Sequence, residues 1–399
     1  HEPHEPVGFE LLLPRMQANL AAFEEQLPLA EWEPIRVKHE QKLALINGLR
    51  PEPGRQRTWW FSMEMLPDEQ LAGLDDSLLD AHGAIATSTA ATAAYLRAKR
   101  LSGSDSPRAA KFLTRMLETG NGGVPVGWPF DVFERIWVLD SYMRVGVDPS
   151  DPRIRAVVER IWHSWWLNEP GLAYADTFEV NDGDDTLVGF AVLNWAGMSP
   201  PDDAILSFWD GDHFRSYVDE RTSSVSVNLH GLMALRQQPG FPHRDLALRV
   251  TDWLLDRTTP EGLFDDKWHL SPYYSVAHAI PAFVGWRDEV ACRMIDFLLG
   301  EQRSDGGWGF FGRSTLEETS HCVIGLYHAA CAGLLADLTP LRRAARFFND
   351  SANGNASERL WIGKTLYRPE AIVRATLHAA ILALRQLRCE VQLHEERVA

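Results

Sequence analysis

The chain has few cysteines, and none of them is spaced like a metal ligand or a disulfide partner. Only four occur, at Cys292, Cys322, Cys331 and Cys389, and no two form a CxxC pair. We therefore expect free thiols in a reducing compartment. The sequence also lacks a signal peptide and any apolar run of transmembrane length. These absences predict a soluble, cytoplasmic protein without membrane insertion.

Positive charge is scarce as well. The formal net charge is −16, and no run of Lys or Arg occurs, which disfavours nucleic acid and anionic membranes as partners. A phosphorylated ligand would need a local basic patch or a bridging divalent metal. The sequence has no HExxH, no Cys–His set and no phosphate-binding loop, so the usual motifs for catalytic zinc and for nucleotides are absent.

Strand-like segments are nearly missing, and helical periodicity dominates instead. Apolar residues at three- and four-residue spacing predict helices over 84–99, 107–117, 131–145, 152–167, 185–196, 224–236, 244–257, 288–300, 315–332 and 369–387. Gly- and Pro-bearing loops separate these segments. The expected fold class is all-α.

A loop in which Gly precedes an aromatic or apolar residue recurs along the chain. Copies at Gly171, Gly262 and Gly306 fit a period near 45 residues. Such a period in an all-helical chain indicates stacked helical hairpins, as an open solenoid or a closed α/α barrel. In the clearest copy, Gln302 and Trp308 flank the turn and are expected to stack on each other, which would tie neighbouring hairpins together. This motif predicts architecture, not catalysis.

The helical pattern also suggests a domain boundary. Gly146, Pro149 and Pro152 interrupt it, which predicts one domain over residues 1–148 and a second over 149–399. The first domain starts without a capping element. We therefore expect that part of this domain precedes residue 1.

Three carboxylates crowd into Asp182-Gly183-Asp184-Asp185-Thr186, directly before a predicted helix. Acidic residues favour helix N-termini, so one interpretation is capping alone. Three carboxylates are more than a cap requires, however. Like charges crowded in a partly buried site raise the pKa of at least one carboxyl, which a general acid needs.

Other acidic clusters match metal-binding motifs less well. Asp75–Asp80 and Asn349–Glu358 depart in spacing from the magnesium motifs DDxxD and NDxxSxxxE, and both are interpreted as turns. The first residues offer further possible metal ligands in His1, Glu2, His4 and Glu5.

Several strings together resemble the class II diterpene cyclases, the copalyl diphosphate synthase group, over essentially the whole chain. They are Pro6-Val7-Gly8-Phe9-Glu10, Asn121-Gly122-Gly123-Val124-Pro125, Phe130 to Trp137, Asp182 to Thr186, Asp266-Lys267-Trp268, Gln302 to Trp308 and Trp361 to Arg368. Squalene-hopene cyclases share the DxDD motif. Its order among the flanking strings is specific to the diterpene group.

The resemblance implies two α/α barrels, a γ domain (1–148) and a β domain (149–399), with the active site between them and no class I α domain. It implies that Asp184, tuned by Asp182 and Asp185, protonates the terminal alkene of a prenyl diphosphate. The diphosphate is retained and is held with Mg²⁺. Geranylgeranyl diphosphate would then become copalyl diphosphate, with the ent isomer favoured.

Further site residues follow from the resemblance. Aromatic faces stabilise carbocations, and the candidates are Trp59, Trp60, Phe61, Trp128 and Tyr174. Lys42, Lys364 and Arg368 correspond to basic residues near the diphosphate, Asn228 is expected to hydrogen-bond the acid, and only Glu2 corresponds to the family's magnesium element. The implied partners are the prenyl diphosphate, a downstream class I diterpene synthase and a second copy of the chain in a homodimer.

Two departures from the family leave the product open. Plant members have LLHS and VPN, whose His and Asn act in the terminating base. This chain has Trp59-Trp60-Phe61-Ser62 and Val124-Pro125-Val126 instead. A halimadienyl, clerodane-type or drimenyl diphosphate is therefore the alternative product.

Other functions explain less of the sequence. Squalene-hopene-type cyclisation leaves the lysines without a purpose. Glycoside hydrolysis needs carboxylates roughly 5–10 Å apart across the bond, which adjacent Asp residues do not provide. A helical scaffold accounts for the repeat and for nothing else.

Overall fold

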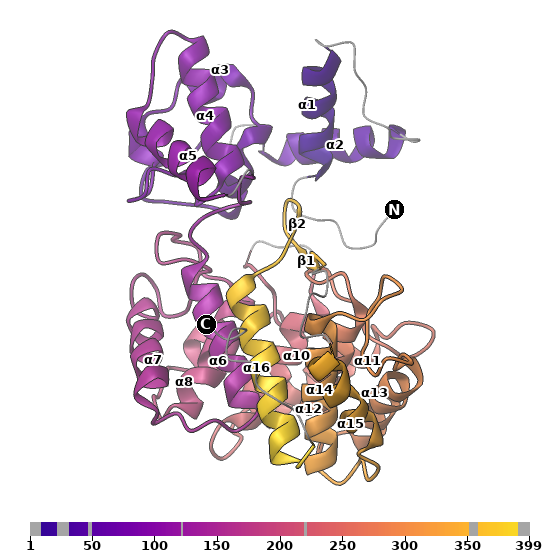
Figure 1. Ribbon diagram of the computed structural model, residues 1–399. Coiled ribbons are helices and arrows are strands. Elements are labelled where there is room, and N and C mark those ends of the chain that lie inside the picture. Colours follow the sequence, from indigo (N-terminus) through magenta and orange to yellow (C-terminus); the bar gives the residue numbers. More distant parts are fainter. Residues whose placement is uncertain are drawn as a thin grey trace. The chain divides into compact units, whose positions relative to one another are not determined.

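The computed structural model describes residues 9–21, 32–46, 50–120, 123–218, 222–350 and 358–389, and these residues are mostly helical (Figure 1). The predicted all-α class is confirmed. The sheet within these ranges is a two-stranded antiparallel hairpin of β1 (Trp361–Ile362) and β2 (Leu366–Tyr367). None of the helices described is long and apolar enough to span a membrane.

The chain divides into two compact units. Unit 1 comprises the described residues up to Phe130, with Ala175–Val180 and Gly363–Thr365, and unit 2 comprises the remaining described residues. The division lies ahead of the predicted boundary at 148/149. The reason is that the helix over Asp131–Arg144 packs on helices of unit 2, so the predicted seam is only a turn inside that unit.

Unit 1 is helical. It contains α1 (Phe9–Ala21), α2 (Glu33–Ile46), η1 (Thr58–Met65), α3 (Asp68–Ala72), η2 (Asp76–Leu78), α4 (Thr89–Leu101) and α5 (Pro107–Thr119). The main contacts run from α2 through α1 and η1 to α4, which also packs on α3 and α5. Helix α4 starts later than predicted, because Ala86 and Thr87 have positive φ (46° and 58°). Ser88 then caps it by accepting the N–H of Ala91.

Unit 2 is a closed α/α barrel. Its inner ring consists of α6 (Asp131–Arg144), α8 (Gly183–Trp195), α10 (Val225–Gln237), α12 (Pro272–Phe283), α14 (Leu316–Cys331) and α16 (Glu370–Gln386). Each helix packs on the next, and α16 closes the ring against α6. Figure 1 shows α16, in yellow, beside α6 and α14. Of the two architectures that the repeat allowed, unit 2 has the barrel.

A second layer of helices covers this ring. It contains α7 (Pro152–Ser164), α11 (Arg244–Leu255), α13 (Asp288–Glu301) and α15 (Thr339–Asp350), while the short α9 (Asp203–Leu206) lies beside α8. The outer helices bury one face, whereas α8, α10 and α12 are buried on almost every side. Full burial is expected of helices at the centre of a barrel.

The Gln302 turn joins neighbouring hairpins, and the contacts that do so are hydrogen bonds and not the predicted stacking of Gln302 on Trp308. Gln302 Nε2 donates to the carbonyls of Gly306 and Pro340, both at 2.8 Å. The buried Trp308 donates its Nε1–H to Leu298 O at 2.7 Å. The turn after α13 is thereby joined to the start of α15.

Candidate functional site

Asp182 caps the N-terminus of α8. Its Oδ1 accepts the backbone N–H of Asp184 at 2.7 Å and that of Asp185 at 3.1 Å. A carboxylate in this position satisfies two N–H groups that lack helical partners and lies at the positive end of the helix. The capping interpretation of the motif therefore holds for this one aspartate.

Gly183 lets another segment approach the start of α8 closely. Its N–H donates to Ser216 O at 2.6 Å, and a Cβ at this position would lie 2.1 Å from Arg215 O. A side chain here would overlap the neighbouring backbone. Packing therefore requires glycine at the second position of the motif.

Asp184 pairs with a histidine on the neighbouring inner helix. Its Oδ1 lies 2.6 Å from His230 Nδ1 on α10, and both side chains are largely buried, at 14% and 2% exposure. Asn228, which was predicted to bond the acid, instead accepts the N–H of Phe214 and donates to the carbonyls of Phe214 and Ser224. That prediction is wrong. His230, two residues further along α10, has the predicted role.

Asp185 is buried, with 3% of the residue exposed. Burial first, and then the charges of Asp182 and Asp184, raise the pKa of Asp185 well above its usual value. The pKa rise that crowding predicts thus falls on Asp185, where burial favours the protonated form of the carboxyl. The three carboxyls of the motif differ in environment: one caps the helix, one contacts an imidazole and one is buried.

A row of polar side chains continues behind His230. Its Nε2 lies 2.9 Å from His278 Nδ1 on α12, and Arg144 Nη2 on α6 lies 3.5 Å from that same nitrogen. Arg144 in turn donates from Nε to Asp140 Oδ2 at 2.6 Å. Burial, with the neighbouring Arg144 and His230, lowers the pKa of His278 well below its usual value. His278 is therefore a neutral imidazole.

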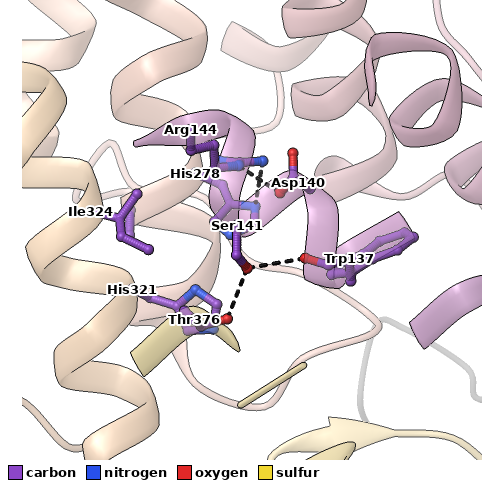
Figure 2. A pocket seen from close by; sticks show the side chains of 9 residues that line it. Trp137, Asp140, Ser141, Arg144, His278, His321, Ile324 and Thr376 are labelled. Carbon is purple, nitrogen blue, oxygen red and sulfur yellow. Dashed lines mark hydrogen bonds and ion pairs between the residues drawn. The ribbon is translucent and has the colours of Figure 1, made fainter. Parts of the chain in front are cut away.

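A small cavity adjoins this row inside the ring (Figure 2). In the figure, Arg144 points toward both His278 and Asp140, and Ser141 bridges Trp137 O and Thr376 Oγ1. The cavity is lined by Trp137, Asp140, Ser141, Arg144, Ala277, His278, His321, Ile324 and Thr376. Each of the six inner helices contributes a polar side chain to the surroundings of the acid and the cavity. These side chains are Arg144, Asp184, His230, His278, His321 and Thr376.

The repeat is a signal that sequence reasoning left unused. Asp184 and His230 are 46 positions apart, and His230 and His278 are 48 apart. Both separations are close to the period of the helical-hairpin repeat, which is near 45 residues. Equivalent positions of successive inner helices face the same centre, so a polar residue recurring at that interval in apolar helices marks the centre of a barrel.

Three further aromatic side chains near the acid were missed as candidates: Trp137, Tyr274 and Trp361. The rings of Trp137 and Tyr274 stand edge-on to His230, with centroids 5.8 and 6.5 Å away. Trp137 Nε1 lies 3.3 Å from Tyr274 Oη, to which it donates. Trp361 is 5.4 Å from Tyr274, centroid to centroid. Trp137 and Trp361 both belong to the strings that carried the family resemblance.

One predicted aromatic residue, Tyr174, lies in unit 2 beside the motif. Together with Asp182 and Asp185 it faces Tyr217. Burial first, then Asp182 through its charge and a hydrogen bond, raises the pKa of the Tyr217 phenol. Tyr217 is thus a second tyrosine near the acid, and it was not predicted.

The other four predicted aromatic residues lie in unit 1. Trp60 belongs to its buried core, at 1% exposure, and Trp59 stands edge-on to it with centroids 6.3 Å apart. Trp128 carries the guanidinium of Arg115 over its ring at 4.1 Å. Phe61 is half-buried.

Lys364, the predicted diphosphate contact in unit 1, is buried among polar partners. Its Nζ lies 2.7 Å from Glu64 Oε1, 2.6 Å from Ser88 Oγ and 4.3 Å from the ring centroid of Phe61. Burial lowers the pKa of the Lys364 ammonium, while Glu64 opposes that change. A diphosphate at this lysine would compete with a carboxylate.

The other two predicted basic residues also have acidic partners. Lys42 in unit 1 pairs with Glu10 at 2.6 Å. Arg368 in unit 2 pairs with Glu370, and its Nε lies 3.9 Å from Glu317 Oε2. The sequence thus identified basic residues held in ion pairs.

Glu2, the predicted magnesium ligand, lies outside the described residues. Within the described ranges one group has metal-ligand geometry: His269, Glu317 and His321 are buried, and their ligand atoms lie within 4.8 Å of one another. Two imidazoles and one carboxylate suit zinc better than magnesium, which prefers oxygen ligands. This group therefore does not fit the predicted Mg²⁺.

Comparisons with known proteins agree with the resemblance. No family model matches the chain. It is 32% identical over 387 residues to a type B diterpene cyclase of Mycobacterium tuberculosis, which covers 94% of this chain and 75% of that protein. It is 34% identical over 326 residues to a copalyl diphosphate synthase of Streptomyces cyslabdanicus, with 77% and 58% covered.

Two further matches bear on product and fold. A (+)-kolavenyl diphosphate synthase of Herpetosiphon aurantiacus is 29% identical over 420 residues, with 95% of this chain and 76% of that protein covered. The solved ent-copalyl diphosphate synthase of Streptomyces platensis superposes with a TM-score of 0.77 at 26% identity, covering 95% of this chain and 76% of that one.

Proposed function

The chain belongs to the class II diterpene cyclases, and from this premise we propose that it converts geranylgeranyl diphosphate to copalyl diphosphate. The reaction starts by protonation and retains the diphosphate. The observation that carries the proposal is the 2.6 Å contact of Asp184 with His230 at the start of α8. It provides a carboxyl with a proton-exchanging partner beside aromatic rings.

In the proposed reaction Asp184 is the general acid. Its proton forms a new C–H bond at the terminal alkene, and the carbocation that results is captured by the next double bond to close the rings. His230 stabilises the carboxylate that Asp184 leaves behind. The raised pKa of Asp185 favours its neutral form, while Asp182 caps α8.

The cation needs surroundings that stabilise charge without adding to it. Trp137, Tyr274 and Trp361 provide aromatic faces near the acid, and each cation–π contact is worth about 0.5–2 kcal/mol. The reaction ends when a carbon loses a proton to a base, so the substrate is isomerised without net gain or loss of atoms.

The diphosphate is proposed to contact Lys42, Lys364 and Arg368, helped by Mg²⁺. Each basic side chain already has a carboxylate partner, so the substrate would exchange one anion for another. No step of the reaction is assigned to the metal.

The ent configuration is the favoured product. A relative of comparable identity is named a kolavenyl diphosphate synthase, so another cyclised diphosphate is the second candidate. The four cysteines are free thiols, which supports a cytoplasmic location. We further propose that a class I diterpene synthase consumes the product and that the chain acts as a homodimer.

The test is a product assay on the purified full chain. Geranylgeranyl diphosphate and Mg²⁺ are added, phosphatase removes the diphosphate, and the alcohol is analysed by chiral chromatography. We expect an ent-configured bicyclic alcohol. Asp184→Asn should lower its formation by at least about a hundredfold, as loss of a general acid does.

The matched control is Asp151→Asn. Asp151 also caps a helix of unit 2, accepting the N–H of Arg153 at the start of α7, and this variant should keep wild-type turnover. The proposal fails if wild type forms no bicyclic alcohol, or if Asp184→Asn forms as much as wild type. If the wild type forms a different bicyclic skeleton, the role of Asp184 as the acid stands and only the proposed product is wrong.

A further inference from the structure

Four consecutive contacts lead away from the acid: Asp184 to His230, His230 to His278, His278 to Arg144 and Arg144 to Asp140. The distances are 2.6, 2.9, 3.5 and 2.6 Å. They join four inner helices, and only Asp184 has a side chain more than one-tenth exposed. The proton positions along this row follow from the chemistry of its members.

Arg144 fixes the first proton position. A guanidinium only donates hydrogen bonds and keeps its charge at any pH that a folded protein tolerates. His278 Nδ1, which faces Arg144 Nη2, must therefore be the unprotonated acceptor nitrogen of a neutral ring. His230 Nε2 faces the same lone pair at 2.9 Å, so it must carry a hydrogen.

That assignment determines what faces Asp184. With its hydrogen on Nε2, a neutral His230 presents the lone pair of Nδ1 to Asp184 Oδ1, only 2.6 Å away. An ionised carboxylate would then repel this lone pair. The contact is favourable only when a proton lies between the two atoms, bound to Asp184 or to an imidazolium of His230.

We propose that His278 and Arg144 are positioning residues that hold His230 with a hydrogen on Nε2 and thereby keep a proton between His230 Nδ1 and Asp184 Oδ1 at neutral pH. This inference rests on the proposed function, because it assigns the row to the loading of the acid. Neither residue contacts the reacting atoms. Both act through His230.

Asp140 makes the arrangement electrostatically tolerable. A buried guanidinium alone would oppose a second positive charge on His230, whereas the ion pair with Asp140 cancels most of the field of Arg144. When Asp184 loses its acidic proton, the imidazolium of His230 has acceptors for both hydrogens. Nδ1–H donates to Asp184, and Nε2–H donates to His278.

Other titratable groups face the Asp184–His230 pair, and the substitutions used below leave them in place. On α8 they are Asp182 and Asp185, on α12 Tyr274, and on α14 His321. Asp266 and His269 face the same region from the preceding loop. The wild type and the His278 variants share all these neighbouring groups. A difference between their pH profiles is therefore caused by the substitution itself.

The first experiment uses His278→Phe, which fills the volume but removes the acceptor. His230 Nε2–H then has no partner. The ring should move its hydrogen to Nδ1 and donate to an ionised Asp184. ¹⁵N spectra of histidine-labelled full chain, with His230 assigned by its own substitution, should show the Nε2–H form in wild type and the Nδ1–H form in His278→Phe.

Activity supplies the second readout. The alkaline limb of the kcat profile in His278→Phe should move to lower pH by about one unit, with KM nearly unchanged. His278→Asn, whose Oδ1 can accept from His230, should restore much of the wild-type profile. Asp140→Asn combined with Arg144→Met removes the ion pair without leaving a buried charge and should shift the limb in the same direction.

Ser164→Ala is the control, since Ser164 is also a buried hydroxyl that donates to the carbonyl four residues earlier, Arg160 O, but it lies on the outer helix α7 and outside the row and the cavity. It should keep both the spectrum and the profile of wild type. The inference is overturned if His230 keeps Nε2–H in His278→Phe, or if the alkaline limbs coincide. The spectra need no substrate, so this outcome is separate from a failure of the cyclase assay.

Discussion

At the scale of the residue, one short motif combines three different uses of the same side chain. Asp182 accepts hydrogen bonds from the backbone, Asp184 contacts His230, and Asp185 is buried beside both. The identity of each carboxyl follows from what it contacts, since the three residues are chemically equal. The difference can be tested by titration.

We predict that Asp185→Asn gains stability relative to wild type as the pH rises. Below about pH 4 the wild-type carboxyl is protonated in both the folded and the unfolded chain. Above that pH the unfolded chain releases a proton that the folded chain retains, because the folded pKa is raised, so the wild-type fold loses stability. Thermal midpoints of both proteins between pH 4 and 8 check this.

Asp151→Asn should behave in the opposite way. Hydrogen bonds from Arg153, first from its side chain and then from its backbone, lower the pKa of Asp151 to about 2. Its contribution to stability is therefore present above the unfolded pKa and is lost as the pH falls toward 2.

If the midpoints of Asp185→Asn and wild type run parallel across the range, the assignment of the buried proton to Asp185 is wrong.

At the scale of the element, α8 depends on a close approach at its first residue. Gly183 lies against Arg215 O, and Phe214 is in turn held by Asn228 on α10. The segment over 208–216 therefore links the starts of two inner helices. Asn228 holds this link.

We expect Gly183→Ala to lower the free energy of unfolding by about 1–3 kcal/mol, because the added methyl would overlap a backbone carbonyl. Gly300→Ala is the control. Gly300 lies inside α13 with no atom near the added methyl, so that variant should be neutral or slightly stabilising. Urea denaturation of both variants measures the difference, and equal midpoints would contradict the packing argument.

The Gln302 turn provides a second test of an element. Gln302→Ala removes two hydrogen bonds that join the turn after α13 to α15, which should cost about 1–3 kcal/mol of stability. Turnover per folded molecule should stay at the wild-type level. Arg346→Ala, at an exposed position of α15, should change neither quantity.

At the scale of the whole molecule, charge opposes the proposed substrate. A chain with a net charge of −16 repels a diphosphate, and the predicted basic contacts are already paired. A divalent cation reduces this repulsion. We predict that removal of Mg²⁺ by EDTA lowers kcat/KM by more than about tenfold, chiefly by raising KM, and that added Mg²⁺ restores it. Unchanged kinetics in EDTA would exclude that role.

Much of the fold could be predicted because barrel helices follow a strict period. The helices over α7, α8, α10, α11, α13, α14 and α16 all lie within a few residues of their predicted ranges. Helix α12 was missed, because Pro272 and Pro281 are usually helix breakers. Pro272 occupies the first turn of α12, where backbone N–H groups have no acceptor within the helix, so the missing N–H of proline costs nothing there. Pro281 lies near the C-terminal end of the helix.

The site was predictable only where a motif is contiguous. Asp182, Asp184 and Asp185 are neighbours in the sequence, so their crowding was visible. The partners of Asp184 come from other helices, and His230, His278 and Arg144 meet only because the ring closes. Asn228 was predicted in place of His230 because the family resemblance placed a polar residue in this region without fixing its register, and a helix turns by about 200° over two residues. A two-residue error therefore selects the opposite face.

Closure of the ring also has a temporal consequence during synthesis. The helices that carry Asp184 and His230 leave the ribosome well before α16, which packs between α14 and α6 and contributes Thr376 to the cavity. A nascent chain therefore contains the proton donor before it contains the enclosure around it. The ring around the acid closes only when α16 docks, so activity should emerge in a single step once α16 has been made.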